Sequence, residues 1–263
     1  MKAIQRSRLQ KKILAWYRTH KRDLPWRNAN DPYAVLVSEI MLQQTQVSRA
    51  IGYYTRFLNQ YPTPASLARA RKPALLRFWS GLGYNNRALR LRELARILVN
   101  QFQGKVPRYR KSLLSLPGIG PYSASAIMAF AFNASIPVID TNIRRVFISK
   151  LHLPETISTS ELEKLADGLI PKGKSRVWHN ALMDYGSAVA TARKTGIAPL
   201  TKQGRFEGSD RWVRGRLVKL LVKCKRVNIS SLNNKFESNQ LSMVLDKMEK
   251  EGLLKRNRDE IVF

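Results

Sequence analysis

The stretch Leu116-Pro117-Gly118-Ile119-Gly120-Pro121-Tyr122-Ser123-Ala124 joins two segments whose apolar residues recur with helical spacing, at about 110–115 and 121–132. Its glycines permit a tight turn in which the backbone closely approaches another group. The N–H groups at the start of the second helix suit a phosphate. We interpret residues 111–132 as a helix-hairpin-helix element, which binds the DNA backbone without reading bases, rather than as an ordinary turn between helices. The residues expected to contact DNA there are Pro117, Gly118, Ile119, Gly120 and Ser123.

Helical periodicity continues on both sides of this hairpin, and no alternating strand pattern competes with it before residue 200. Glycine and proline separate the helical segments from one another. Further helices are expected at about 7–20, 32–42, 47–60, 64–70, 73–79, 86–102, 138–151, 160–169 and 176–192. The first 200 residues are therefore expected to be all-α.

The chain changes character after residue 193. Residues 194–209 place Gly196, Pro199, Gly204 and Gly208 among Lys and Arg, which indicates a basic linker. Helices are then expected at 210–225, 231–236 and 238–250, before a small hairpin at 253–263, an order typical of a winged helix-turn-helix. We predict a helical domain at 1–193, a linker at 194–209 and a winged-helix-like domain at 210–263.

The composition indicates a polyanionic partner. The 263 residues include 47 Lys and Arg against 18 Asp and Glu, a formal net charge of +29. Nucleic acid is therefore the expected partner, and a soluble or ribosome-associated basic protein is the alternative. The single cysteine, Cys224, excludes an internal disulfide and a multi-cysteine metal cluster, and fits a reducing cytoplasmic setting, on the nucleoid in a bacterium or archaeon. No apolar run is long enough to predict a membrane span.

Two acidic residues stand out. Asp140 follows the hairpin by twenty residues, after an apolar run and before a helix, a position where an acid is ordinarily an N-cap. Glu39 lies in Val35-Leu36-Val37-Ser38-Glu39-Ile40-Met41-Leu42, the most apolar stretch around any acid in the chain. Burying such an acid is costly, so a functional role is expected for it.

These motifs together resemble a known family. The hairpin followed by a turn and an aspartate resembles the signature of the helix-hairpin-helix DNA glycosylase superfamily. Within it, Leu24-Pro25-Trp26-Arg27, the segment 38–47 and Gly81-Leu82-Gly83-Tyr84 are similar to the MutY-type adenine DNA glycosylases. The resemblance covers about residues 8–193. It implies two helical subdomains with a cleft between them, and excision of an adenine mispaired with guanine or 8-oxoguanine.

The resemblance also implies residue roles. Glu39 corresponds to the acid that protonates a purine ring nitrogen, Asp140 to the carboxylate that faces the deoxyribose, and Asn142 to the asparagine beside that carboxylate. Tyr122 occupies the position where bifunctional relatives such as endonuclease III carry a lysine nucleophile. The base pocket is matched by Arg22, Leu24, Trp26, Arg27 and Asn180, the last where the family often has Glu or Gln. Five residues outside the hairpin correspond to residues that contact DNA in the family: Gln43, Gln44, Thr45, Leu82 and Tyr84. Tyr84 corresponds to the wedge that fills the gap left in the base stack. The alternative for Tyr84 is core packing.

Chemistry supports this pair of acids. Adenine leaves readily only when it is protonated, and a carboxylic acid can protonate it at neutral pH only if burial raises its pKa. A second, ionised carboxylate can stabilise the sugar cation, and Asp140 at a helix start suits that task. Because no lysine occupies the Tyr122 position, we expect hydrolysis by water without an obligatory Schiff base.

The sequence departs from the family in several places. Many adenine glycosylases of this family carry a four-cysteine iron–sulfur loop after the helical domain. At the position of the first cysteine ligand this chain has Ala190, and no cysteine follows it nearby, so we expect no cluster and no cofactor. Thr141 and Asn85 also differ from the usual residues, and the tail does not match the family's 8-oxoguanine-sensing domain. The basic residues of the loop either contact phosphate or form a solvated linker: Arg193, Lys194, Lys202 and Arg205. The basic residues of the tail serve DNA contacts or a protein-docking module: Arg211, Arg214, Arg216, Lys255, Arg256 and Arg258.

Three other functions are considered. A glycosylase for thymine or uracil opposite guanine shares the hairpin tyrosine, although Gln43-Gln44-Thr45 and Glu39 favour adenine. A DNA-binding regulator would need neither Glu39 nor Asp140. An alkylation-repair enzyme would need an aromatic-rich pocket, which is not evident. The expected partner is double-stranded DNA with a mismatch or damaged base. The protein is expected to bind it as a monomer, and no association with a membrane is expected.

Overall fold

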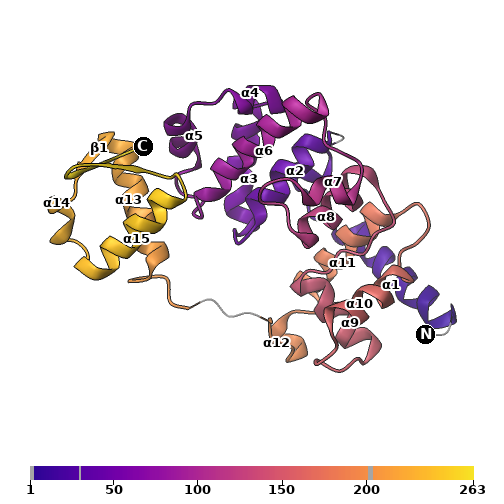
Figure 1. Cartoon of the computed structure of the whole chain (residues 1–263). Coiled ribbons are helices and arrows are strands. Elements are labelled where there is room, and N and C mark those ends of the chain that lie inside the picture. Colours follow the sequence, from indigo (N-terminus) through magenta and orange to yellow (C-terminus); the bar gives the residue numbers. More distant parts are fainter. Residues whose placement is uncertain (1–2, 30, 201–203) are drawn as a thin grey trace. The chain divides into compact units, whose positions relative to one another are not determined.

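The computed structural model describes residues 3–29, 31–200 and 204–263, and is predominantly helical (Figure 1). Contacts divide the chain into two compact units, Met1–Glu39 with Val106–Lys202, and Ile40–Lys105 with Gln203–Phe263. Each unit therefore combines segments that are distant in sequence. The domain boundaries expected at 193 and 209 stay a prediction.

The first unit is built from helices. They are α1 (Ala3–His20), the 3-10 helix η1 (Pro25–Arg27), most of α2 (Pro32–Leu42), α7 (Arg110–Leu114), α8 (Pro121–Phe132), α9 (Thr141–Leu151), α10 (Thr159–Asp167), α11 (Ser175–Ala188) and α12 (Ala192–Thr195). Helix α11 packs on α1, α8 and α9. Its Trp178 is fully buried in a core that also contains Ile13 of α1 and Phe147 of α9. Burial of these large side chains stabilises the unit through the hydrophobic effect.

A second, smaller core in this unit determines where three functional segments meet. It joins Val35 of α2 to Ala126, Ala129 and Phe130 of α8, and to Val138 in the strand-like segment that leads into α9. Glu39 lies one helical turn beyond Val35, and Asp140 lies two residues beyond Val138. The apolar contacts of this core therefore hold the segments that carry the candidate acids together.

The second unit begins with α3 (Val47–Gln60), α4 (Pro64–Ala68), α5 (Lys72–Trp79) and α6 (Asn86–Phe102). Helix α6 packs on α4 and α5. Aromatic rings fill the space between α3 and α5: the Phe57 ring lies 5.6 Å from that of Phe78 and 5.9 Å from that of Trp79, each edge to face. Such edge-to-face pairs add to the stability that burial provides.

The C-terminal part of this unit has the arrangement of a winged helix-turn-helix (Figure 1). It contains α13 (Asp210–Cys224), β1 (Arg226–Asn228), α14 (Ser230–Asn233), α15 (Ser238–Lys250), β2 (Lys255–Asn257) and β3 (Glu260–Val262). The strands form an antiparallel sheet in the order β1-β3-β2, in which Ile261 pairs with Val227 and with Arg256. Helix α13 packs on α15 and also on α5.

Several expected elements need correction. The helix expected at 138–151 begins only at Thr141, because Asp140 caps it. The helix expected at 176–192 ends at Ala188, and the short α12 lies partly in the segment expected to be a linker. The helix expected at 231–236 is the single turn Ser230–Asn233. Strand β1 and the 3-10 helix η1 were not expected at all. In the described part of the chain, no helix combines the length and apolarity needed to cross a membrane.

Candidate active site

The hairpin has the expected geometry. Gly118 adopts a φ of +83°, which favours glycine, and the Ile119 N–H donates to the Leu116 carbonyl at 3.2 Å. Helix α8 begins at Pro121, and its N-cap Gly120 has no side chain with which to cap the first N–H groups. The Ile119 and Ser123 side chains are buried, so their predicted DNA contacts are restricted to backbone atoms. The helix start remains suited to a phosphate.

Asp140 combines the two positions that sequence reasoning offered for it. It is the N-cap of α9, where its Oδ1 accepts from the Ile143 N–H at 2.7 Å. Its Oδ2 accepts from the Asn142 amide at 2.8 Å, so the predicted neighbour Asn142 is in direct contact. Capping and a chemical role are compatible here, because both require an anionic carboxylate held by N–H donors.

Arg145 orients Asn142, and sequence reasoning did not identify it. Its Nη2 donates to the Asn142 Oδ1 at 2.5 Å, and its Nε donates to the Ala190 carbonyl at 3.0 Å. The arginine is buried, with 9% of its surface exposed. Because the amide oxygen of Asn142 is occupied by Arg145, its NH₂ group is directed at Asp140.

Gly186 of α11 makes this arrangement possible. A Cβ atom at Gly186 would lie 2.7 Å from the Asn142 carbonyl oxygen and 2.8 Å from the Asn142 Cβ. These distances are shorter than atoms can approach, so only glycine allows α11 to pack this closely against the first turn of α9. The position of Asn142, and through it of Asp140, depends on this contact.

Glu39 is the buried acid of the site, with 9% of its surface exposed. Burial raises its pKa from 4.5 to about 8, and the negative charge of Asp140 acts in the same direction. Both effects penalise the charged form of Glu39. At neutral pH this carboxyl therefore retains its proton, as the apolar sequence around it predicts.

Asp140 is the acid that ionises first. Burial raises its pKa, but the Ile143 N–H, the Asn142 amide and the charge of Arg145 all counteract this rise. For Glu39, both burial and the negative charge of Asp140 raise the pKa. The pair thus divides into one neutral acid and one carboxylate, which is the division that acid catalysis with charge stabilisation requires.

Tyr122 completes the group at the start of α8. Its pKa is raised well above 10 by burial first, and then by the charges of Glu39 and Asp140. The residue as a whole is 40% exposed, so part of its side chain remains accessible. A phenol that keeps its proton serves as a hydrogen-bond donor and not as a nucleophile.

The arginines predicted for the base pocket have a buried partner. Arg27 forms two bonds to Asp184, at 2.6 Å and 2.7 Å, and the Arg22 Nε lies 2.5 Å from the Asp184 Oδ1. Asp184 is 1% exposed, and its pairing with the two arginines is that of a structural residue. Leu24 is buried, whereas Trp26 and Asn180 are partly exposed. Contact of these residues with a base stays a prediction.

His179 is a packed residue. Its Nε2 accepts from the Val138 N–H at 3.2 Å, and its Nδ1 lies 2.8 Å from the Ser175 carbonyl. Burial lowers its pKa to about 4, so the ring is neutral at physiological pH. The histidine supports the segment before Asp140 and does not supply a proton.

Arg87 organises the loops predicted to contact the duplex, a role that sequence reasoning missed. Its guanidinium donates to the carbonyls of Ile40, Met41, Gln43, Leu82 and Gly83 and to the Thr45 hydroxyl, at 2.5 to 3.2 Å. It thereby joins the end of α2, the segment after it and the loop before α6. Its own side chain is buried, and burial lowers its pKa to about 10, so it stays charged at neutral pH.

Two residues of these loops differ in exposure. Tyr84 is 40% exposed at a φ of +47°, so it is not a core residue, and the wedge interpretation fits better than core packing. Leu82 is 3% exposed, so a DNA contact at this position is restricted to its backbone. Gln44 also has a positive φ, of +56°.

The residues present do not fit an iron–sulfur cluster. Ala190 is buried, and its carbonyl is engaged by Arg145. The single cysteine, Cys224, lies exposed on α13. Within residues 3–29, 31–200 and 204–263, no group of three or more His, Cys, Asp or Glu side chains is arranged to hold a metal ion.

The hairpin, the helical fold and the paired acids define a class. The sequence model of the "HhH-GPD superfamily base excision DNA repair protein" matches residues 37–172, and the chain belongs to this superfamily. The resemblance inferred from the motifs is thereby confirmed. The absence of the iron–sulfur cluster stays a prediction.

Particular relatives place the chain more closely. It is 39% identical to the adenine DNA glycosylase of Mycolicibacterium smegmatis over 80% of this chain and 78% of that protein. It is 34% identical to the thymine/uracil-DNA glycosylase of Methanothermobacter thermautotrophicus over 69% of this chain and 84% of that protein. The solved structure of a thermostable thymine-DNA glycosylase superposes with a TM-score of 0.67 at 33% identity, covering 73% of this chain and 90% of that one.

Proposed function

We propose that this protein is an adenine DNA glycosylase of base excision repair, which flips an adenine out of the duplex and hydrolyses its N-glycosidic bond. The observation that carries this proposal is the buried Glu39, whose pKa is raised to about 8 by burial and by the charge of Asp140. Similarity to adenine DNA glycosylases of bacteria and mammals supports the choice of base.

The reaction uses both acids. Glu39 donates its proton to a ring nitrogen of the adenine, and the bond between C1′ and the base breaks with its electron pair moving to the base. The sugar is left with oxocarbenium character, which the Asp140 carboxylate stabilises. Water then adds to C1′ and loses a proton, giving an abasic site and free adenine. Asn142 and Arg145 keep Asp140 ionised and oriented during these steps.

Tyr122 stands at the hairpin position where bifunctional relatives carry a lysine nucleophile, so no amine is supplied at that position. Tyr122 retains its proton beside the two acids and can donate a hydrogen bond there. The enzyme is thus monofunctional: base release does not require a Schiff base, and strand cleavage is not coupled to it.

The proposed partner is double-stranded DNA with an adenine opposite guanine or 8-oxoguanine. The enzyme acts as a monomer, in the cytoplasm and on the nucleoid of a prokaryotic cell. The hairpin turn and the excess of cationic residues support DNA binding, because both suit phosphates.

Removal of thymine or uracil opposite guanine is the second candidate. It is favoured by the similarity to thymine/uracil-DNA and thymine-DNA glycosylases. Asn180 also stands where adenine glycosylases often have Glu or Gln. We rank it lower because a neutral acid with a pKa of about 8 matches protonation of a purine leaving group.

A substrate panel tests the proposal. Purified protein is incubated with duplexes that hold A opposite G, 8-oxoguanine or C, and T or U opposite G, and base release is measured after alkali. Excision of A is expected, with at least a 100-fold loss in Glu39→Gln and Asp140→Asn, while Glu163→Gln on the exposed face of α10 serves as the matched control. Excision of T or U alone would establish the second candidate. Borohydride should trap little complex, and abundant trapping would contradict hydrolysis.

A further inference from the structure

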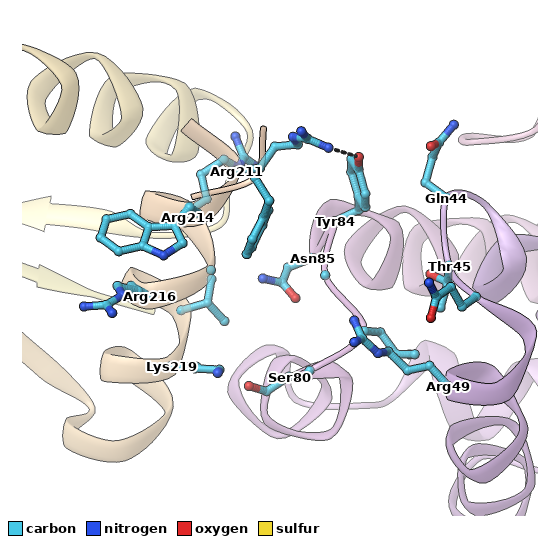
Figure 2. A pocket seen from close by; sticks show the side chains of 18 of the residues that line it. Gln44, Thr45, Arg49, Ser80, Tyr84, Asn85, Arg211, Arg214, Arg216 and Lys219 are labelled. Atoms are coloured by element: carbon cyan, nitrogen blue, oxygen red, sulfur yellow. Dashed lines mark hydrogen bonds between the residues drawn. The ribbon is translucent and has the colours of Figure 1, made fainter. Parts of the chain in front are cut away.

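A cationic groove lies within the second unit, whose residues include neither Glu39 nor Asp140. It has a volume of about 930 Å³. One wall is formed by residues 44–49 and by the loop Ser80–Asn85, and the other by α13 of the winged-helix part (Figure 2). The catalytic mechanism uses none of these residues.

The charge of the groove selects its ligand. Five cationic side chains line it: Arg49, Arg211, Arg214, Arg216 and Lys219. Among the described residues of its walls, none is Asp or Glu. Arg214 pairs with Glu251, which lies outside the walls, at 2.5 Å. A ligand with several negative charges would complement the positive field of these side chains.

Aromatic rings alternate with these cations. Trp212 lines the groove, and the Arg216 guanidinium lies 4.2 Å from the centre of its ring. Phe206, 59% exposed, and Tyr84, 40% exposed, also line it. Cations that follow a backbone, with aromatic rings that can meet base faces, are the combination found in grooves that bind nucleic-acid strands.

One contact connects the two walls. The Arg211 Nη1 donates to the Tyr84 hydroxyl at 3.1 Å, and its Nη2 donates to the Gly204 carbonyl at 2.9 Å (Figure 2). Arg211 therefore fixes the end of the tyrosine that the sequence predicts as the wedge. This hydrogen bond connects the winged-helix part with the loop Ser80–Asn85, which carries the predicted wedge Tyr84.

We infer that this groove is a second DNA-binding site, in which α13 and Arg49 hold backbone phosphates next to the step where Tyr84 enters the duplex. The inference rests on the proposed function, because it takes DNA as the partner. It gives the winged-helix part a role in binding distorted DNA, in place of docking a protein. Arg211 acts as a positioning residue for Tyr84.

Salt-dependent binding tests the inference. The whole chain carrying Glu39→Gln is titrated with a duplex that contains one A·8-oxoguanine mispair and with a fully paired duplex of otherwise the same sequence. The binding affinity is measured at several salt concentrations. Each phosphate contact contributes about 0.9 to the slope of log affinity against log salt. Arg216→Gln with Lys219→Gln should lower the slope by about 1.8 and weaken binding roughly tenfold or more at 0.1 M salt.

The matched control removes two charges from the same region without touching the groove. Lys223→Gln with Lys225→Gln should leave the slope nearly unchanged, because neither residue lines the groove. Equal losses in both pairs would show a general field effect and overturn the inference, as would an unchanged slope in the groove pair. Arg49→Gln on the opposite wall, expected to lower the slope by about 0.9, provides the test if the α13 pair fails to fold.

The wedge contact is tested separately. Tyr84→Phe and Arg211→Gln should each weaken binding to the mismatched duplex more than to the paired one, and the double variant should lose little more than either alone. Additive losses would contradict a shared contact. Base release by the wild-type protein is measured in parallel, so that a failure of the proposed function, with no excision, is distinguished from a failure of the groove, with excision and unaltered slopes.

Discussion

In the proposed reaction Glu39 donates the proton, and two features of its surroundings favour the protonated form. The apolar face of α2 and the charge of Asp140 both raise its pKa, to about 8. Burial raises the pKa of Asp140 as well, but hydrogen bonds from Ile143 and Asn142 and the charge of Arg145 counteract this rise. An acid and a carboxylate can thus coexist in one site at pH 7.

The first prediction concerns the pH dependence of base release. Because the reaction needs Glu39 protonated, the single-turnover rate should fall tenfold per pH unit above about pH 8. On the acid side it should fall when Asp140 takes up a proton. Rapid-quench measurements from pH 5 to 10 check this. The low residual rate of Glu39→Gln should show no decline near pH 8, and a wild-type rate that stays constant up to pH 9.5 would contradict the assignment.

A second prediction concerns stability. The folded pKa of Glu39 lies above its unfolded value, so its contribution to stability is complete below about pH 4.5 and is lost as pH rises towards about 8. Above about pH 8 the folded state must hold a buried negative charge on Glu39, which destabilises it. Glu39→Gln removes this cost and should be the more stable protein at pH 8, by several kcal/mol. Its advantage should shrink towards pH 5. Urea unfolding at both pH values checks this, and an advantage independent of pH would refute it.

Sequence reasoning identified the two acids because each carries a local signal. Glu39 is surrounded by apolar residues, and Asp140 precedes a helix after the hairpin. Arg145 and Arg87 carry no such signal, since their partners include carbonyl groups more than forty residues away. The contact of Asp184 with Arg22 and Arg27 was hidden for the same reason. Long-range polar partners become apparent only once the fold brings the chain segments together.

At the scale of elements, Arg87 provides the clearest prediction. It donates hydrogen bonds to carbonyl groups at the end of α2 and in the loop before α6. Lysine has three donors on one atom and cannot span both segments. Arg87→Lys should lower the free energy of unfolding by about 3 kcal/mol. Denaturant unfolding checks this against Arg90→Lys, an exposed position on the same helix, which should change stability by less than about 0.5 kcal/mol.

Helices were predicted well where an apolar stripe persists over several turns, as in α3 and α6. The failures have local causes. Strand β1 has only three residues and alternates around a single partly buried position, Val227, so its pattern is too short to recognise. The helix start near 140 was misplaced because apolar residues precede the N-cap Asp140, and the helix end near 190 because Val189 and Ala190 continue the apolar pattern beyond Ala188. Periodicity detects helix interiors better than helix ends.

At the scale of the molecule, the division into units could not be read from the linear sequence. Helix α2 passes from one unit to the other between Glu39 and Ile40. Glu39 and Asp140 therefore belong to one unit, while Arg87, Tyr84 and the cationic groove belong to the other. Each unit combines segments that are distant in sequence, such as Ile40–Lys105 with Gln203–Phe263, and no local pattern in the sequence indicates such a combination.

This division predicts that damage to one unit spares the chemistry of the other. Leu217 on α13 is fully buried, and α13 packs on both α15 and α5. Leu217→Ala should cost about 2–5 kcal/mol of stability in the second unit and weaken DNA binding. Hydrogen exchange should then accelerate in α5, α13 and α15, while α8, α9 and α11 retain their protection. Met243→Ala, at a position 48% exposed on α15, is the control and should change neither the stability nor the hydrogen exchange.

At saturating protein, the alkaline decline in the rate of base release should stay near pH 8 in Leu217→Ala, because Glu39 and Asp140 lie in the first unit. Equal loss of protection in α9 and α13 would show that the two units unfold as one.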